Sequence, residues 1–185
     1  MNRSCCGMGI AGMLLVSMLL NACATPARSN NMIADSPLLS RVDRSSPMHE
    51  AVVIAGVGGG EETNPLVTSR VGSAELEDAV RESMRRYGYL SPPGGDARYR
   101  LDVFLLDLKQ PQSAYTVIVH SSIRYRLTRI RDGKILHDDI VTAAARVGVN
   151  EELYGPARLK IANERSVQAN ITAFLMRLSS FEAAP

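Results

Sequence analysis

The sequence predicts an α+β domain in which a mostly antiparallel four-stranded sheet carries two helices packed on one face. Three observations support this fold class. Residues 99–105 and 117–127 alternate apolar and polar residues, as antiparallel strands with one buried face do, and residues 135–147 follow an Asp-Gly turn as a returning strand. An apolar run at residues 50–57 predicts a further strand. Two segments, 74–87 and 156–179, repeat apolar residues every three or four positions, which is typical of helices with one buried face.

A glycine-rich loop separates the first strand from the first helix. Residues 50–57 read EAVVIAGV, a short run rich in β-branched residues, and Gly58 to Gly60 follow. Ser73 is the expected N-cap of the helix, because a serine oxygen accepts a hydrogen bond from an N–H group of the first turn. Gly88 marks the expected end of the helix, since glycine readily adopts the left-handed conformation found there. The expected core positions are Leu76, Ala79, Val80, Met84 and Tyr87.

Three strands are predicted over residues 99–105, 117–127 and 135–147. The dipeptide Asp132-Gly133 lies between the second and third of these strands and is a strong hairpin signal. The alternation places His120, Arg124 and Arg126 on the wet face of the sheet, opposite the apolar residues of the same strand.

The last helix is expected to begin at Pro156, a residue favoured in the first turn, and to end near Ser179. Its expected core face contains Asn170 among apolar residues, and Asn163, Ser166 and Asn170 form a polar stripe. Because buried polar groups are generally paired, Asn170 is expected to bond to a strand end or a loop. The alternative interpretation is a stripe that contacts a partner protein. The apolar core positions are Val167, Ile171, Phe174, Leu175 and Leu178.

The N-terminus has the layout of a secretory signal. Residues 1–4 carry one arginine and no acid, and residues 7–20 form an uncharged apolar run. This run is shorter than the roughly 20 residues that a membrane-spanning helix needs. Residues 1–22 are therefore predicted to be a signal peptide rather than part of the domain.

The residues before Cys23 point to a lipid anchor. Leu20-Asn21-Ala22-Cys23 resembles the bacterial lipobox, and the resemblance implies cleavage before Cys23 and acylation of that cysteine. Ala24 stands where an aspartate would favour retention in the inner membrane, so the pattern resembles cargo sent to the outer membrane. Stable anchoring takes two signals, such as two acyl chains, and lipidated Cys23 would supply them without a membrane-spanning helix.

Composition then excludes several classes of function. Cys5 and Cys6 would leave with the signal peptide, so the mature chain is expected to hold no disulfide, thiol nucleophile or cysteine-based metal site. Removal of residues 1–22 takes away Arg3 alone and leaves 20 basic residues against 19 acidic ones. This balance does not provide the basic surface that nucleic acid requires. The chain has no tryptophan and few aromatic residues, which argues against a carbohydrate-stacking cleft.

The predicted domain organisation has four parts. Residues 1–22 are the signal peptide, and residues 23–47 comprise the lipidated Cys23 and a flexible tether rich in Ser, Asn, Arg and Pro. Such a tether would span roughly 25–30 Å, which follows from the square-root scaling of a flexible chain. Residues 48–180 form the single α+β domain, and residues 181–185 form a tail.

Candidate catalytic and metal sites are weak. The glycines at 56–60 lack the spacing of a dinucleotide-binding loop, so a flexible loop is expected there. His120 and His137 with Asp138 and Asp139 offer a metal site only if they converge, with His49 as a distant third histidine. The acid pairs at 61–62 and 151–152 have no apolar surroundings that would raise a pKa. No enzyme activity, metal or cofactor is therefore expected.

The lipobox, the tether and the element order, ending in ANERSVQANITAFLMRL at residues 162–178, resemble small outer-membrane lipoproteins of Gram-negative bacteria. Similar layouts occur in auxiliary lipoproteins of ABC-type lipid transporters and in the lipopolysaccharide-assembly lipoprotein. The resemblance implies non-enzymatic work at the periplasmic face of the outer membrane, within an envelope transport or assembly complex. A partner protein would contact the wet sheet face at Arg124, Arg126 and His120, or a free strand edge. The alternatives are a module that binds lipid or glycolipid between sheet and helices, and an enzyme with an unrecognised site.

Overall fold

The computed structural model describes residues 25–63, 69–111 and 115–182; residues 181 and 182 are described by their backbone alone. The elements are α2 (Ser29–Met32), β1 (Val52–Gly58), α3 (Ser73–Arg86), β2 (Tyr99–Lys109), β3 (Thr116–Arg129), β4 (Ile135–Gly148) and α4 (Gly155–Glu182). The predicted order of strand, helix, three strands and helix is confirmed. The predicted signal peptide and Cys23 lie outside the described residues.

The four strands form one mixed sheet in the order β1-β2-β3-β4. The pairs β2–β3 and β3–β4 are antiparallel, whereas β1 runs parallel to β2. The parallel pair follows from the helix between them, because a strand that returns after a crossover helix can lie beside the first in the same direction. The sheet is therefore mostly antiparallel, as predicted, with one parallel edge strand.

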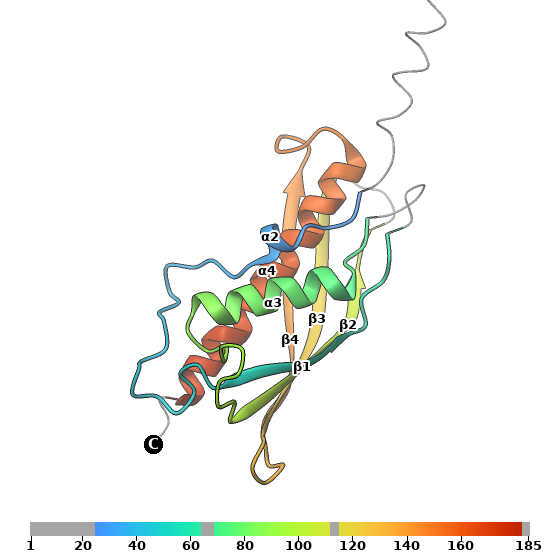
Figure 1. Cartoon of the computed structure of the whole chain (residues 1–185). Coiled ribbons are helices and arrows are strands. Elements are labelled where there is room, and N and C mark those ends of the chain that lie inside the picture. Colours follow the sequence, from blue (N-terminus) through green and yellow to red (C-terminus); the bar gives the residue numbers. More distant parts are fainter. Residues whose placement is uncertain (1–24, 64–68, 112–114, 183–185) are drawn as a thin grey trace, which may run out of the picture.

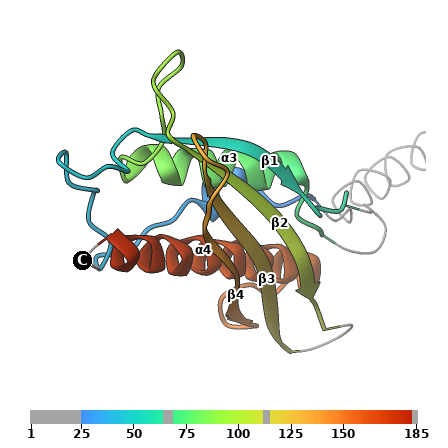
Figure 2. The ribbon, with the colours of Figure 1, turned by 90° about the horizontal axis from the view of Figure 1, so that it is seen from below.

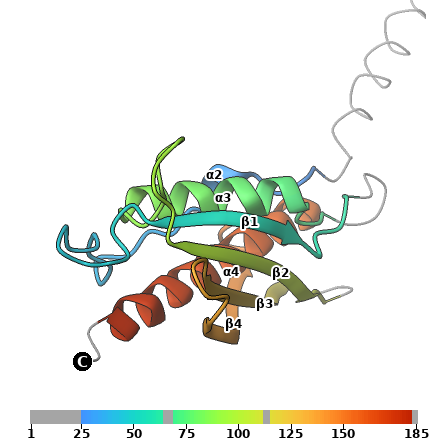
Figure 3. The same cartoon turned by 60° about the horizontal axis from the view of Figure 1, so that its bottom comes forward.

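All three described helices lie on one side of the sheet (Figure 1). The helix α3 packs over β1, α4 packs over β3 and β4, and α2 contacts both helices. Figure 2 shows the twisted sheet crossing α3 and α4. The C-terminal turns of α4 extend beyond the sheet (Figure 3). The prediction of two helices packed on one face is confirmed, and the short α2 adds a third helix to that layer.

The core fills the space between these helices and the sheet. The ring of Tyr125 on β3 stacks on the ring of Phe174 on α4, with centroids 4.0 Å apart and planes 4° from parallel. Leu101 and Leu127 from the sheet, and Ile171 from α4, are fully buried around them. All the predicted core positions of α4 are buried: Val167, Asn170, Ile171, Phe174, Leu175 and Leu178.

The ends of α3 show one correction and one confirmation. Gly72, not Ser73, is the N-cap, and no side chain caps the helix. The Ser73 hydroxyl instead accepts a hydrogen bond from the N–H of Gly60 at 3.1 Å, which ties the glycine-rich loop to the helix. At the other end Gly88 has the expected positive φ of 83°, and its N–H donates to the carbonyl of Arg85 at 3.2 Å.

The segment before β1 differs from the predicted flexible tether. Its described part runs along the helical layer, and α2 belongs to it. The carboxylate of Glu164 on α4 accepts hydrogen bonds from the Arg28 N–H and the Asn31 amide, both at 2.8 Å. The Ser83 hydroxyl on α3 accepts one from the Ala34 N–H at 2.9 Å. The segment docks because it supplies apolar side chains to the core: Ala27, Met32, Ile33, Ala34 and Val42.

Candidate functional site: the open face of the sheet

One face of the sheet carries no helix in the described part of the chain, and large apolar side chains are exposed on it. Phe104 on β2 is 51% exposed, and Leu106 is exposed to a similar extent. Ile118 on β3 and Ile140 on β4 are also exposed. Scattered apolar residues are normal on a protein surface, but several on one sheet face suggest an interaction site.

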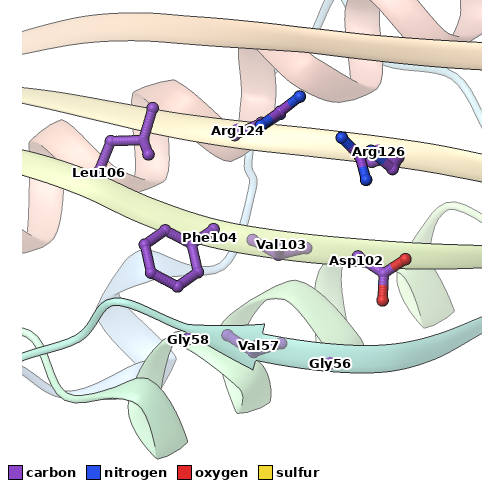
Figure 4. A pocket seen from close by; sticks show the side chains of 9 residues that line it. All are labelled: Gly56, Val57, Gly58, Asp102, Val103, Phe104, Leu106, Arg124 and Arg126. Atoms are coloured by element: carbon purple, nitrogen blue, oxygen red, sulfur yellow. The ribbon is translucent and has the colours of Figure 1, made fainter.

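A shallow depression of about 560 Å³ lies on this face, across β1, β2 and β3 (Figure 4). Phe104 and Leu106 form its apolar part, while Arg124 and Arg126 stand along its β3 side. Asp102 adds a carboxylate on β2. The complete set of lining residues is Gly56, Val57, Gly58, Asp102, Val103, Phe104, Leu106, Arg124 and Arg126.

Gly58 on β1 makes room for the depression. Gly58 pairs with Phe104, and a Cβ atom at Gly58 would lie only 3.1 Å from the Phe104 ring. The ring therefore lies over the strand where a larger residue would displace it. Gly56 pairs with Asp102, but a Cβ atom there would lie at an ordinary contact distance of 3.7 Å from Asp102 Oδ1. The flexible loop expected over residues 56–60 is a strand up to Gly58, and Gly58 shapes the surface beside Phe104.

The two arginines are bound to a carboxylate on the neighbouring strand. Arg124 donates from Nε to Asp138 Oδ1 at 2.6 Å and from Nη2 to Oδ2 at 2.8 Å. Arg126 donates from Nε to the same Oδ2 at 3.1 Å. These hydrogen bonds, chiefly those from Arg124, lower the pKa of Asp138 from 3.8 to about 2. The three side chains form a fixed cluster with one excess positive charge.

The predicted contact residues are only partly brought together. Arg124 and Arg126 share the depression. His120 lies four residues before Arg124 on β3, opposite Lys109 of β2. Because a strand rises about 3.3 Å per residue, His120 and Arg124 are roughly 13 Å apart along β3. His120 is on the same open face and is exposed, as predicted, yet it does not line the depression.

The two histidines considered as possible metal ligands do not converge. His120 pairs with Ala144 and faces solvent, whereas His137 pairs with Leu127 and points toward the helices, 6.1 Å from the Phe174 ring. The two histidines lie on opposite faces, seven residues apart along the paired strands. Asp139 is bound by Arg177 of α4. Within residues 25–63, 69–111 and 115–182, no group of three metal-ligating side chains gathers.

The loop acids are surface ion pairs. Glu61 lies 3.1 Å from Arg70, and Glu151 lies 2.5 Å from Arg165. The hydrogen bond from Arg165, with a smaller effect from the Gly148 N–H, lowers the pKa of Glu151. A general acid requires a raised pKa, so the arrangement at Glu151 is the opposite of what a glycosidase needs.

Asn170 anchors a buried polar network between α4 and the sheet. Its side-chain amide donates to the carbonyls of Ser121 and Val141 at 3.1 and 2.7 Å, and its oxygen accepts from the Tyr125 hydroxyl at 3.1 Å. The expected pairing of Asn170 is therefore confirmed, but its partners lie within β3 and β4 rather than at a strand end. The hydroxyl of Ser166 joins the network at Ser121, 2.9 Å away.

Sequence reasoning missed Phe104 and Leu106 as site residues and considered Asp138 only as a candidate metal ligand, although one signal was present for Phe104. Alternation along residues 99–105 places Phe104 on the same face as Arg100 and Asp102, so an exposed phenylalanine was predictable. Asp138 lies opposite Arg126, a position in which a charge pair forms. A plain count back from the Asp132-Gly133 hairpin would place His137 there instead, because the register shifts by one residue between Leu127 and Thr128.

This α+β architecture is shared with proteins of known structure. Protein XCC0632 from Xanthomonas campestris, assigned to family DUF330, matches with a TM-score of 0.56 and 12% identity, over 84% of this chain and 99% of that chain. A predicted lipoprotein from Caulobacter crescentus matches with a TM-score of 0.50 and 12% identity, over 72% and 91%. At this identity the likeness shows the fold alone. No family model and no curated protein matches the sequence.

No helix in the described residues combines the length and the apolar character needed to cross a bilayer.

Proposed function

We propose that this chain is a lipid-anchored accessory protein of the Gram-negative envelope, acylated on Cys23 and held at the periplasmic face of the outer membrane. In this proposal the open face of the sheet binds a partner protein of a transport or assembly complex. The protein acts by binding rather than by catalysis. The depression between Phe104 and Arg124 is the observation that carries the proposal.

The anchor is supported from two directions. The lipobox-like Leu20-Asn21-Ala22-Cys23 stands directly before the described domain. One of the solved structures that share the fold is described as a lipoprotein. Another is a protein from the Gram-negative bacterium Xanthomonas campestris. An acylated cysteine attaches a domain of this kind without a membrane-spanning helix.

Partner binding is supported by the chemistry of the open face. Phe104 and Leu106 offer apolar area that a partner would remove from water, and aromatic residues and arginines are enriched in protein interfaces. Arg124 and Arg126 are held in place by Asp138, so little side-chain ordering remains to oppose binding. Their excess positive charge favours a partner segment that combines apolar and acidic residues.

The lipid-binding alternative has less support. A lipid carried between sheet and helices requires a hollow apolar cavity, but the stacked rings of Tyr125 and Phe174 fill that space. The buried network of Asn170 and Ser166 also crosses it. The packing therefore favours a scaffold that presents its outer surface.

Metabolic labelling with palmitate tests the anchor. Cys23→Ala is expected to abolish labelling and to release the protein from the membrane fraction. Cys5→Ala and Cys6→Ala are matched controls, because both residues precede the predicted cleavage point and should leave labelling unchanged. Persistent labelling of the Cys23→Ala protein would refute the anchor.

Site-specific photo-crosslinking in intact cells tests the partner surface. A photoreactive amino acid at Phe104 is expected to capture a defined envelope protein, and Leu106→Asp should remove that product. Leu38, which is 79% exposed away from the sheet, provides the control position. Equal crosslinking from Phe104 and Leu38, or a product that survives Leu106→Asp, would contradict a specific site.

A further inference from the structure

The docked N-terminal segment fixes where the chain enters the domain. The Ser69 hydroxyl donates to the carbonyl of Thr25 at 2.8 Å, and Lys160 Nζ donates to the Thr25 hydroxyl at 3.0 Å. The N–H of Ala27 donates to the carbonyl of Arg70 at 3.2 Å. Glu164, which is buried, holds the following turn through Arg28. Thr25 is thus tied to one end of the molecule, beside the first turns of α4.

Covalent geometry limits how far Cys23 can lie from this end. Cys23 lies two positions before Thr25 in the chain, and an extended chain spans at most about 3.6 Å per residue. The sulfur-bearing residue therefore stays within about 7 Å of Thr25, plus the length of its own side chain. A flexible tether of 25–30 Å would let the domain tumble, whereas this short link would bring a defined end of the domain to the lipid.

Three strongly exposed apolar or aromatic side chains lie at the same end. Tyr115 is 87% exposed just before β3, Leu153 is 86% exposed, and Tyr154 is 42% exposed just before α4. The pair Thr116–Gly148 joins the start of β3 to the end of β4, so the two loops adjoin. Figure 1 shows this end of the sheet, the start of α4 and the beginning of the described chain together.

The loop that carries Leu153 is held rather than loose. Arg158 lies almost buried in the first turn of α4 and donates from Nη1 to the carbonyls of Glu152 and Leu153, at 2.6 and 3.1 Å. The guanidinium thus fixes the backbone while the Leu153 side chain points outward. A fixed loop that exposes leucine and tyrosine together is costly in water but suits a membrane interface, where tyrosine is enriched.

We propose that the end of the domain bearing Tyr115, Leu153 and Tyr154 rests on the lipid bilayer and inserts these side chains among the lipid head groups. The inference depends on the proposed anchor at Cys23 and adds an orientation to it. The strands then rise away from the membrane, and the depression at Phe104 faces sideways, where a neighbouring envelope protein can reach it.

The absence of tryptophan from the chain makes a direct test possible. Each of Tyr115→Trp and Leu153→Trp introduces a single fluorescent probe into the full acylated protein, which is then reconstituted in vesicles of phosphatidylethanolamine and phosphatidylglycerol. We expect the emission to shift to shorter wavelength and to be quenched by brominated phospholipid. Ile135→Trp is the matched control, because Ile135 is exposed beside the hairpin at the opposite end; its emission should remain sensitive to aqueous iodide.

The outcomes separate the orientation from the anchor. If the protein labels with palmitate and floats with the vesicles while the Leu153→Trp probe remains fully accessible to iodide, the orientation is wrong and the anchor stands. Equal quenching of the Leu153→Trp and Ile135→Trp probes by brominated lipid would also overturn the orientation. If no acylated protein is obtained and the chain does not float, the anchor and the orientation both fail. Quenching confined to positions 115 and 153 supports the inference.

Discussion

Arg124 and Asp138 form a two-pronged ion pair across β3 and β4, with both arginine donors within 2.8 Å of the carboxylate oxygens. The pair stands at the rim of the depression on the open face, next to Arg126. Its geometry shows that the arginines predicted to contact a partner are already organised by the protein's own carboxylate. They present a directed positive charge instead of two mobile side chains.

The Asp138 pair gives stability a defined pH dependence. Its folded pKa of about 2 lies below its usual value of 3.8, so the carboxylate stabilises the fold above that usual value and this contribution disappears as the pH falls toward 2. We expect the difference in unfolding midpoint between wild type and Asp138→Asn to be constant at neutral pH and to vanish near pH 2. Urea titrations across the pH range measure this difference.

A double-mutant cycle provides the control. In an Arg124→Ala background Asp138 keeps only Arg126, so Asp138→Asn should alter the midpoint less than it does in the wild type. An effect of Asp138→Asn that is the same in both backgrounds, or that persists unchanged at pH 2, would show that the ion pair does not contribute as described.

Substitution of Phe174 and substitution of Phe104 are expected to have opposite effects on stability and on partner binding. Phe174 is buried against Tyr125, so Phe174→Ala should lower the free energy of unfolding by about 3–5 kcal/mol. Phe104 is half exposed on the open face, and Phe104→Ala should change stability by no more than about 1 kcal/mol while it weakens partner crosslinking at neighbouring positions. Thermal or urea unfolding of the two variants measures the contrast, and similar losses would mean that Phe104 belongs to the core.

The buried amide of Asn170 should be costly to remove. Asn170→Leu leaves the Tyr125 hydroxyl and the carbonyls of Ser121 and Val141 without this partner, and we expect a loss of about 2–3 kcal/mol of unfolding free energy. Asn150→Leu, at an exposed loop position, is the control and should have little effect. A neutral Asn170→Leu would indicate that water or a rearranged strand replaces the amide.

The docking of the N-terminal segment depends on Glu164. Glu164→Ala removes the acceptor for the Arg28 N–H and the Asn31 amide, at a cost of about 1–3 kcal/mol. Hydrogen exchange of the amides in residues 27–34 should become about 5- to 150-fold faster, the factor that this free energy corresponds to. Glu77→Ala, which breaks only the exposed pair with Arg81, should leave these amides protected. Unchanged exchange after Glu164→Ala would show that apolar packing alone holds the segment.

The strands and long helices were predictable because their signals are local. Period-two alternation in residues 117–127 and the Asp132-Gly133 turn specify β3 and its hairpin without knowledge of distant residues. The parallel direction of β1 and β2 follows from the crossover through α3, but the register shift between Ile54 and Gly56 was not predictable from the sequence pattern. A bulge changes which side chains share a face, and alternation alone does not reveal it.

The docking of the residues before β1, which were predicted to form a flexible tether, was not predictable from local sequence signals. Ala27, Met32 and Ile33 are too widely mixed with polar residues to show a period, yet they are buried. Their place is set by Glu164 and Gln168, more than a hundred residues away, which bind Arg28 and the carbonyl of Ile33. Composition suggested a flexible chain because it contains no information about partners so distant in sequence.

The contact between residues 25–34 and α4 also imposes an order on folding. Residues 25–34 are made before every strand, but the helix that holds them through Glu164 is the last element of the chain. Contacts between segments so distant along the sequence form late, because a large loop must close first. During export the stretch beside Cys23 would therefore stay accessible to processing enzymes until the rest of the domain had crossed. In the proposed pathway, the finished fold would cover residues 25–34 only after Cys23 had been acylated.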